Sequence, residues 1–600
     1  TLMVKNTRFS SLRKQLNKVK KKKAALFLMV LLSLSSFAQE TEHQHQAKTI
    51  TNQQIDSILN AQKATVDHAE LFGKLVIQDA GGRMKPVNTF ASELLRKVSH
   101  KDTYKGMDAN QVVVSMVTNP RLWFSVPFIY MIEENTKVRD LLGIPNDQKY
   151  ARLSDLFTDK GEYKLSEVVD KAHKKIIKSK FEQSVLNIDE RVNLLYQAIT
   201  GSIFKFFPLQ DDENNKWYSY TEQNEFFKGK DSLNAAYLLP VYSEALFKAV
   251  KSKDYTKADE YLEMIHKFQR KVGGEVMPSE EKVKLELFYN KYDIFKGLFW
   301  KYMLASLLLF IVVIVQIFKK SKIIEFLVKA VSVVIVLLFV YHTIGLGVRW
   351  YISGHAPWSN GYESMIYISW ATMLFGMILG RKSALTLAAT TFVVSMILMI
   401  AHWNWMDPSI GNLVPVLDSY WLMIHVSIIV GSYGPFTLSM ILGVLVLLLY
   451  VFTTSKNKER LDLVIKEITI ISEMSIMIGL VMLTIGNFLG GMWANESWGR
   501  YWGWDPKETW ALINIMIYAF ILHMRLIPGL RGRFTFNIMS VFAFASILMG
   551  YLGVNHLLSG LHSYAAGDAV PIPNEIWGWL LTCVVLSILA FFKYRKYYKK

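Results

Sequence analysis

The chain has 600 residues, of which 51% are hydrophobic, 13% aromatic and 20% charged. This composition is too apolar for an ordinary soluble enzyme and too charged for a chain lying wholly in lipid, so we expect a membrane protein with a soluble portion. The net charge of +18 is explained by the excess of Lys and Arg that membrane proteins usually carry in their cytoplasmic loops. We therefore predict no nucleic-acid binding. The single cysteine, Cys583, lies in an apolar run and excludes a disulfide framework, a CxxC redox centre and a cysteine-based zinc site.

Residues 1–39 form a basic segment followed by an apolar run. Residues 18–23 are nearly all basic, and residues 24–38 are mostly apolar and end in small side chains. This order is typical of a secretory signal, and a membrane span is the alternative, because the chain begins with Thr1 rather than Met. Both interpretations place Gln39 and the residues after it outside the cytoplasm.

Residues 40–297 have the frequent charges of a soluble domain. Segments such as DKAHKKIIKSKFEQSVLNIDERVNLLYQAI repeat apolar residues at helical spacing, which predicts a mainly helical extracytoplasmic domain. The HQH stretch at 43–45 lies among polar residues and is interpreted as a solvated linker rather than a metal site.

Residues 298–592 hold a series of long apolar runs, most of them close to the roughly 20 residues that cross a bilayer. The runs are 298–318, 326–348, 362–380, 384–402, 420–452, 464–490, 509–527, 537–558 and 576–592. They predict a mainly α protein, a polytopic membrane helix bundle of about nine spans, followed by a basic cytoplasmic tail at 593–600.

The charges between these runs indicate the orientation of the chain. With residues 40–297 outside, every connection assigned to the cytoplasm is basic; these connections hold Lys319, Lys320, Lys322, Arg381, Lys382, Lys456, Lys458, Arg460, Arg531, Arg533, Lys593, Arg595 and Lys596. The outer connections hold only Arg349, Arg500 and Lys507. The positive-inside rule therefore places the connection between the sixth and seventh spans on the outer side.

That outer connection, predicted as a loop over residues 491–510, is unusually rich in tryptophan. Five indoles occur within eighteen residues: Trp493, Trp498, Trp502, Trp504 and Trp510. An aromatic belt would spread its tryptophans around the whole rim, so this cluster favours a surface for a large flat ligand such as a porphyrin. Gly491, Gly499 and Gly503 are expected to let the backbone turn.

Histidines in membrane spans are candidate haem-iron ligands. His425 lies five residues into the fifth run, and His562 follows the eighth run, so both share the outer level of the tryptophan loop. His523 lies fourteen residues beyond Thr509, about 21 Å further down the seventh span at ~1.5 Å per residue, and cannot serve the outer site. His342 lies in the outer half of its own span and is a poor partner for His523.

The segment WGRYWGWDPKETWALI resembles the WWD motif of the CcsA/ResC family of system II cytochrome c biogenesis. RWYISGHAPWSNGYESMIYISW and LLSGLHSYA are similar to flanking segments of that family. The resemblance implies that the WWD loop holds haem b between His425 and His562, and that His523 binds haem within the membrane. The family supplies the second intramembrane histidine from a CcsB/ResB component, either a separate subunit or a half that precedes Thr1 in a fusion.

The activity that the resemblance implies is that of a holocytochrome-c synthase, a haem lyase that moves haem outward and attaches it to the CXXCH cysteines of apocytochrome c. A thioredoxin-like thiol-reducing partner is implied, since the one thiol of this chain is buried. The implied location is the bacterial cytoplasmic (inner) membrane, with residues 40–297 and the WWD loop on the periplasmic side.

Several alternatives stay open from the sequence alone. The same histidines would suit a haem or small-molecule transporter that makes no covalent bond, or an electron-transfer cytochrome. Asp505, with Lys507 and Glu508, would orient propionates or peptide, or Asp505 would simply cap the next helix ahead of Pro506. Gly431, Gly434 and Pro435 predict either a kink that opens a passage or a fit of a long helix to the bundle.

Overall fold

A computed structural model describes the protein over residues 51–131, 135–158, 160–175, 179–209, 212–222, 229–318, 321–402, 406–413, 419–554 and 574–598. The chain divides into two units at residue 55, and the described residues from Asp56 onward belong to the second, which is compact. The predicted signal or span at 24–38, the HQH stretch at 43–45 and His562 all lie outside the described residues.

The part of the second unit that precedes the apolar helices is mainly helical, as predicted. Its helices are α2 (Asn52–Ala61), α3 (Val66–Gly73), α4 (Val87–Ser99), α5 (Ala109–Thr118), α6 (Pro120–Trp123), α7 (Thr136–Leu142), α8 (Ser166–Lys174), α9 (Lys180–Thr200), α11 (Gly229–Ser252), α12 (Thr256–Val272) and α13 (Glu280–Tyr292), with 3-10 turns η1 (Leu153–Leu156) and η2 (Gly274–Val276). Capping boxes begin two of them, Asp108 with Gln111 at α5 and Ser179 with Glu182 at α9.

Among the described residues of this region there are also three two-stranded antiparallel sheets. They pair β1 (Val76–Gln78) with β2 (Met84–Pro86), β3 (Pro127–Tyr130) with β4 (Tyr150–Arg152), and β5 (Phe207–Pro208) with β6 (Trp217–Tyr218). The sequence predicted helices in this region and none of these strands. Strands of two to four residues are too short for a period-2 pattern, so their pairing is decided by tertiary contacts.

Two buried ion pairs hold the β1–β2 hairpin against the helices. Arg83 Nη2 lies 2.8 Å from Glu286 Oε1 in α13, and Lys85 Nζ lies 2.6 Å from Glu93 Oε2 in α4. All four side chains are almost fully buried, and Thr89 donates a further bond to Glu286. Helix α13, which leads into the first membrane span, is therefore tied to the hairpin by charged groups that would be costly to separate.

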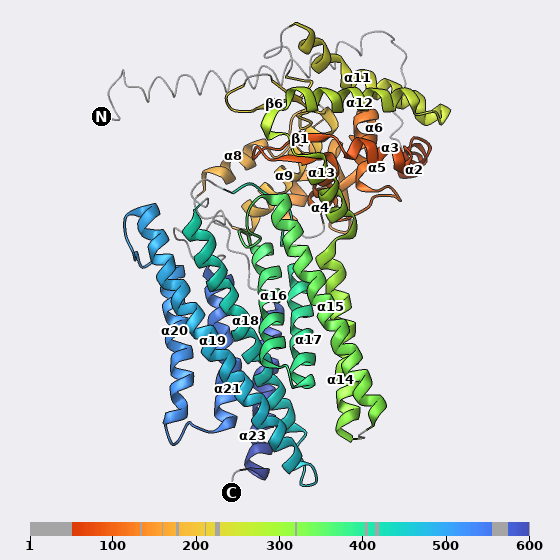
Figure 1. The fold of residues 1–600 in the computed structure, drawn as a ribbon. Helices are drawn as coiled ribbons and strands as arrows, with labels where there is room; N and C mark the ends of the chain where they lie inside the picture. Colours follow the sequence, from red (N-terminus) through yellow and green to blue (C-terminus); the bar gives the residue numbers. More distant parts are fainter. Residues whose placement is uncertain are drawn as a thin grey trace, which may run out of the picture. The chain divides into compact units, whose positions relative to one another are not determined.

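Nine helices in the described residues are long and apolar enough to cross a membrane, which confirms the predicted fold class. They lie side by side in Figure 1. In chain order they are α14 (Ile294–Phe318), α15 (Lys322–Ser353), α16 (Gly361–Leu379), α17 (Ala384–Ala401), α18 (Tyr420–Val451), α19 (Lys458–Trp498), α20 (Pro506–His523), α21 (Arg533–Leu548) and α23 (Asn574–Tyr597), with η4 (Met524–Leu526) after α20 and the π-turn η5 (Met549–Gly553) after α21.

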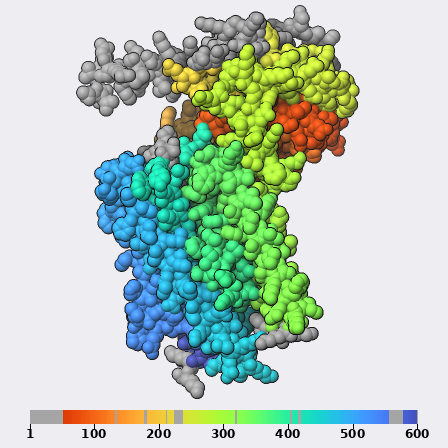
Figure 2. Space-filling view, in the orientation of Figure 1, coloured from red at the N-terminus to blue at the C-terminus, as the bar shows by residue number. Residues whose placement is uncertain are grey.

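Helix α18 is the centre of the bundle and packs against α16, α19, α21 and α23. Helices α14, α15 and α20 lie at the edges, and their side chains form much of the surface in Figure 2. One apolar cluster contains residues of every helix from α14 to α21, and a second joins α18 to α19, α21 and α23. The helix that carries His425 is thus the most enclosed one.

The close packing of α18 on α16 depends on Gly434. A Cβ at Gly434 would lie 2.7 Å from the backbone nitrogen of Thr372 and 2.8 Å from the backbone carbon of Ala371. Pro435, the next residue, lies inside the continuous helix, and its carbonyl accepts a bond from Ser475 Oγ at 2.7 Å. The structure therefore gives Gly434 the packing role that was one of the two predictions for this segment.

Candidate functional site

His425 lies in the second turn of α18, and its ring contacts residues of α18 and α19. Its Nδ1–H donates to the carbonyl of Trp421 at 2.9 Å, which leaves the lone pair of the neutral ring on Nε2. Trp493 of α19 stacks on the imidazole at a centroid distance of 5.4 Å and an angle of 26°. Gly490 leaves room for the ring, since a Cβ there would lie 3.2 Å from His425 Cδ2.

The tryptophan segment is partly helical and partly loop. Helix α19 continues to Trp498 and ends at Gly499, which has a positive φ of 69° and donates its N–H to Asn495. The connecting loop is therefore residues 499–505, shorter than the predicted 491–510. Gly491 lies inside α19, where a Cβ would come within 3.1 Å of the carbonyl of Tyr501, so it serves close approach rather than a turn.

The five tryptophans have different environments. Trp493 is fully buried between His425 and Trp498, and it meets the Trp498 ring edge-on at 4.7 Å. Trp502 and Trp504 form a second perpendicular pair at 5.7 Å. Trp504 has a positive φ of 56° and is 70% exposed, and the neighbouring Tyr501 is 65% exposed. Trp493 thus supports His425 directly and Trp498 supports Trp493, while the loop presents open aromatic surface.

Asp505 caps α20. Its carboxylate accepts from the backbone N–H of Lys507 at 3.0 Å, and Glu508 Oε2 accepts from the backbone N–H groups of Gly503 and Asp505. Asp505 and Glu508 form a capping box with Pro506 at the first helical position. The capping role weighed for Asp505 and Pro506 is confirmed, and a role toward propionates stays a prediction.

The chain after α21 packs beside the start of α20. The π-turn η5 packs on α20, where a Cβ at Gly550 would lie 3.7 Å from Trp510 Cβ and 3.0 Å from the Asn514 side chain. Tyr551 Oη donates to the carbonyl of Gly361 at the start of α16, at 2.9 Å. The last described residues before position 555 therefore lie beside α16 and α20.

His523 and His342 have contrasting positions. His523 is exposed at the last residue of α20, and its Nδ1 donates to the carbonyl of Ala519 at 2.7 Å. His342 is fully buried, with its Nε2 donating to the carbonyl of Ile366 at 3.2 Å. Two residues beyond His523, Arg525 forms an ion pair of 2.7 Å with Glu473 of α19, a pairing that the sequence did not predict.

Comparison with known proteins decides the family. A family model described as "Cytochrome C assembly protein" matches residues 358–562. Protein NrfI of Wolinella succinogenes is 39% identical over 532 residues, which are 88% of this chain and 58% of NrfI. CcsA of Prochlorococcus marinus (strain MIT 9301) is 36% identical over 274 residues, which are 41% of this chain and 87% of that protein. This chain belongs to the CcsA family of cytochrome c biogenesis proteins.

The membership confirms the resemblance carried by the WWD segment. CcsA of Chlamydomonas reinhardtii is similar as well, with 38% identity over 226 residues, 36% of this chain and 63% of that protein. A solved structure titled Cytochrome c Heme Lyase CcmF overlaps with a TM-score of 0.34 at 15% identity over 50% of each chain, which is too low to establish a shared fold. The chain spans 58% of the length of NrfI.

Other residues near His425 belong to a motif segment for which the sequence alone indicated no individual roles. Trp358 and Tyr367, both within the segment PWSNGYESMIYISW, donate hydrogen bonds to the turn of α18 that carries His425. Arg349 forms a fully buried ion pair with Glu363 of that segment. The usable signal was the pair of opposite charges in adjacent membrane spans, which is costly unless the two side chains meet.

Proposed function

We propose that this CcsA-family protein presents haem on the outer side of the membrane for covalent attachment to apocytochrome c. The activity is that of a holocytochrome-c synthase, and haem b is the substrate. The observation that supports it best is the assembly around His425, where the Trp421 carbonyl fixes the tautomer, Trp493 stacks on the ring and Gly490 leaves space. This arrangement suits an imidazole that ligates iron through Nε2.

His562 is the proposed second axial ligand on the outer side. The tryptophan loop would supply aromatic surface to the porphyrin faces, for which the 70% exposure of Trp504 and the half-buried Trp502 and Trp510 are suitable. Trp493 would hold the His425 ring in place, and Trp498 would pack against Trp493. The vinyl edge of the ring must then remain open to the incoming peptide.

The reaction adds each cysteine thiol of the CXXCH segment across one vinyl group. A carbon–sulfur bond forms, the thiol proton ends on the neighbouring vinyl carbon, and no external oxidant or reductant is consumed. The protein contributes mainly by positioning, because holding both reactants in place is worth up to ~7–11 kcal/mol in well-oriented reactions. Axial ligation by two imidazoles would hold the ring still while the peptide approaches.

His523 is the proposed intramembrane ligand, and it would need a partner. Its side chain is exposed on α20, which is accessible on most of its surface, so a histidine from a CcsB/ResB-like component could meet it there. The further proposed partners are apocytochrome c and a thioredoxin-like protein that keeps the substrate cysteines reduced. The proposed location is the bacterial inner membrane, with the WWD loop on the periplasmic side.

The test combines a spectrum with a product. The purified protein should show the absorption of a bis-histidine haem, and His425→Ala or His562→Ala should change it. A co-expressed CXXCH reporter should acquire covalent haem with the wild-type protein and lose most of it with either variant. Unchanged spectra in both variants would remove the outer site, and an altered spectrum without any covalent product would favour a haem transporter.

A further inference from the structure

Side chains of the α15–α16 region donate hydrogen bonds to the backbone of α18 before and after His425. Trp358 Nε1–H donates to the carbonyl of Met423 at 3.2 Å, two residues before His425. Tyr367 Oη–H donates to the carbonyl of Ser427 at 3.3 Å, two residues after it. Both acceptors are backbone atoms, so the two bonds act on the position of the helix rather than on the imidazole.

The two donors also support one another. The rings of Trp358 and Tyr367 lie 4.8 Å apart at an angle of 42°, and Trp350 packs edge-on against Trp358 at 5.5 Å. Tyr367 stacks on Trp370 at 5.7 Å, and Trp370 donates in turn to Thr343 of α15. Rings that are packed on two sides lose little freedom when they make a hydrogen bond, which makes each of these bonds more effective.

A buried ion pair holds the segment from which Trp358 projects. Arg349 Nε and Nη2 each lie 2.9 Å from Glu363 Oε1, and both side chains are completely buried. Glu363 accepts in addition from the backbone N–H of Ser359, the residue next to Trp358, at 2.9 Å. The charged pair therefore fixes the chain at the start of α16, and with it the indole that reaches α18.

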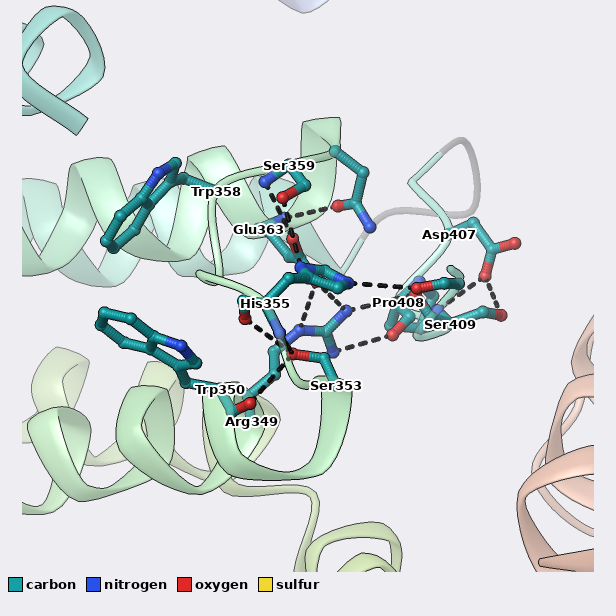
Figure 3. Close-up of polar contacts among 12 residues, drawn as sticks. Arg349, Trp350, Ser353, His355, Trp358, Ser359, Glu363, Asp407, Pro408 and Ser409 are labelled. Atoms are coloured by element: carbon teal, nitrogen blue, oxygen red, sulfur yellow. Dashed lines mark hydrogen bonds and ion pairs between the residues drawn. The ribbon is translucent and has the colours of Figure 1, made fainter. Parts of the chain in front are cut away.

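The remaining donors of Arg349 hold the outer connection between α17 and α18. Nη1 donates to the carbonyl of Pro408 at 3.0 Å and Nη2 to that of Ser409 at 3.2 Å, as Figure 3 shows. Asp407 closes this turn by accepting from the backbone N–H of Ser409 at 2.9 Å. Burial opposes ionisation of Asp407, but the Ser409 bonds and the charge of Lys97 keep its pKa below the ordinary value, so it stays a carboxylate.

The same guanidinium reaches the region before the membrane spans. Nη1 also donates to Tyr289 Oη of α13, at 3.2 Å. Burial raises the pKa of Tyr289, so its hydroxyl stays protonated. One buried side chain thus joins α13, α15, α16 and the loop that precedes α18.

From these contacts we infer that Trp358 and Tyr367 are positioning residues for His425, and that the Arg349–Glu363 pair acts through Trp358. The inference rests on the proposed function, since it concerns the ligand strength of His425 toward haem iron. The local contacts of His425 set the direction of its ring. Trp358 and Tyr367 set the position and the rotation of the helical turn that carries His425.

The test uses the full chain purified with its haem and the variants Trp358→Phe, Tyr367→Phe and the double variant. Each single change removes one donor and keeps an aromatic ring. We expect the ratio of low-spin to high-spin ferric haem to fall about fivefold for each bond lost, the factor that corresponds to about 1 kcal/mol. Added imidazole should restore the low-spin spectrum, as it should in His425→Gly, which a general folding defect would not allow.

The matched control is Trp300→Phe, the same chemical change at an indole of α14 that is 60% exposed and takes no part in these contacts. Its spin ratio should equal that of the wild type. If His425→Ala alters the spectrum and the double variant does not, the positioning role is wrong while the outer haem site stands. If His425→Ala leaves the spectrum unchanged, the outer site falls and the positioning role with it. If the double variant cannot be purified as a folded protein, the test rests on Tyr367→Phe alone. A wild-type spin ratio in Tyr367→Phe then overturns the inference.

Discussion

Replacing Glu363 with glutamine should destabilise the membrane bundle strongly. The amide has nearly the same shape, but it leaves the guanidinium of Arg349 without a counter-charge at a position where both side chains are 0% exposed. Removing one partner of a buried pair costs about 3–5 kcal/mol. Arg349 keeps neutral acceptors on Tyr289, Pro408 and Ser409, so we expect the lower end, about 3 kcal/mol.

The assay is a double-mutant cycle on the reversible unfolding of the purified protein in mixed detergent micelles, with Arg349→Met, Glu363→Leu and their combination. Because the double variant leaves no unpaired charge, its loss of stability should be smaller than the sum of the two single losses by about 2 kcal/mol. The control is Glu467→Gln at an exposed carboxylate of α19, which should change stability by less than about 0.5 kcal/mol. Additive single effects, or a Glu363→Gln loss as small as that of the control, would refute the reasoning.

Three further predictions concern packing, capping and pH. Gly434→Ala should lower the free energy of unfolding by about 1–3 kcal/mol, because the new Cβ would meet backbone atoms of α16. Gly347→Ala should not destabilise the protein, because the space around Gly347 is open, and equal effects of the two changes in unfolding assays would contradict this reasoning. Asp505→Ala should lower the free energy of unfolding by about 1 kcal/mol, and Asp505→Asn should lower it much less, because Asn can also cap a helix. Equal losses of stability in the two variants would exclude capping as the cause. Burial lowers the pKa of His68 despite its bond to Asp259, so the folded state binds fewer protons and thermal stability should fall as the pH drops below about 6.5. His68→Gln should flatten that pH dependence, and an identical slope in both proteins would argue against it.

The sequence by itself determined the number of spans among the described residues. Whether a segment enters lipid depends on the transfer free energies of its own residues, a sum that needs no partner. Helix caps are equally local, and Asp505 before Pro506 was correctly weighed as one because a cap involves only residues within one turn. The family was determined in the same way, since the WWD segment is a contiguous stretch.

Tertiary structure decided what surrounds each of these elements. Residues 491–498 continue α19, which places Trp493 against His425 instead of in a loop, because packing against α18 outweighs the local turn signal of Gly491. The pairing of Arg349 with Glu363, and the reach of Trp358 and Tyr367 to α18, join residues 14 to 65 positions apart. Hydropathy shows that a charge in a span needs a partner, but only the packed helices decide which side chain supplies it, because that choice depends on distances across the bundle and not along the chain.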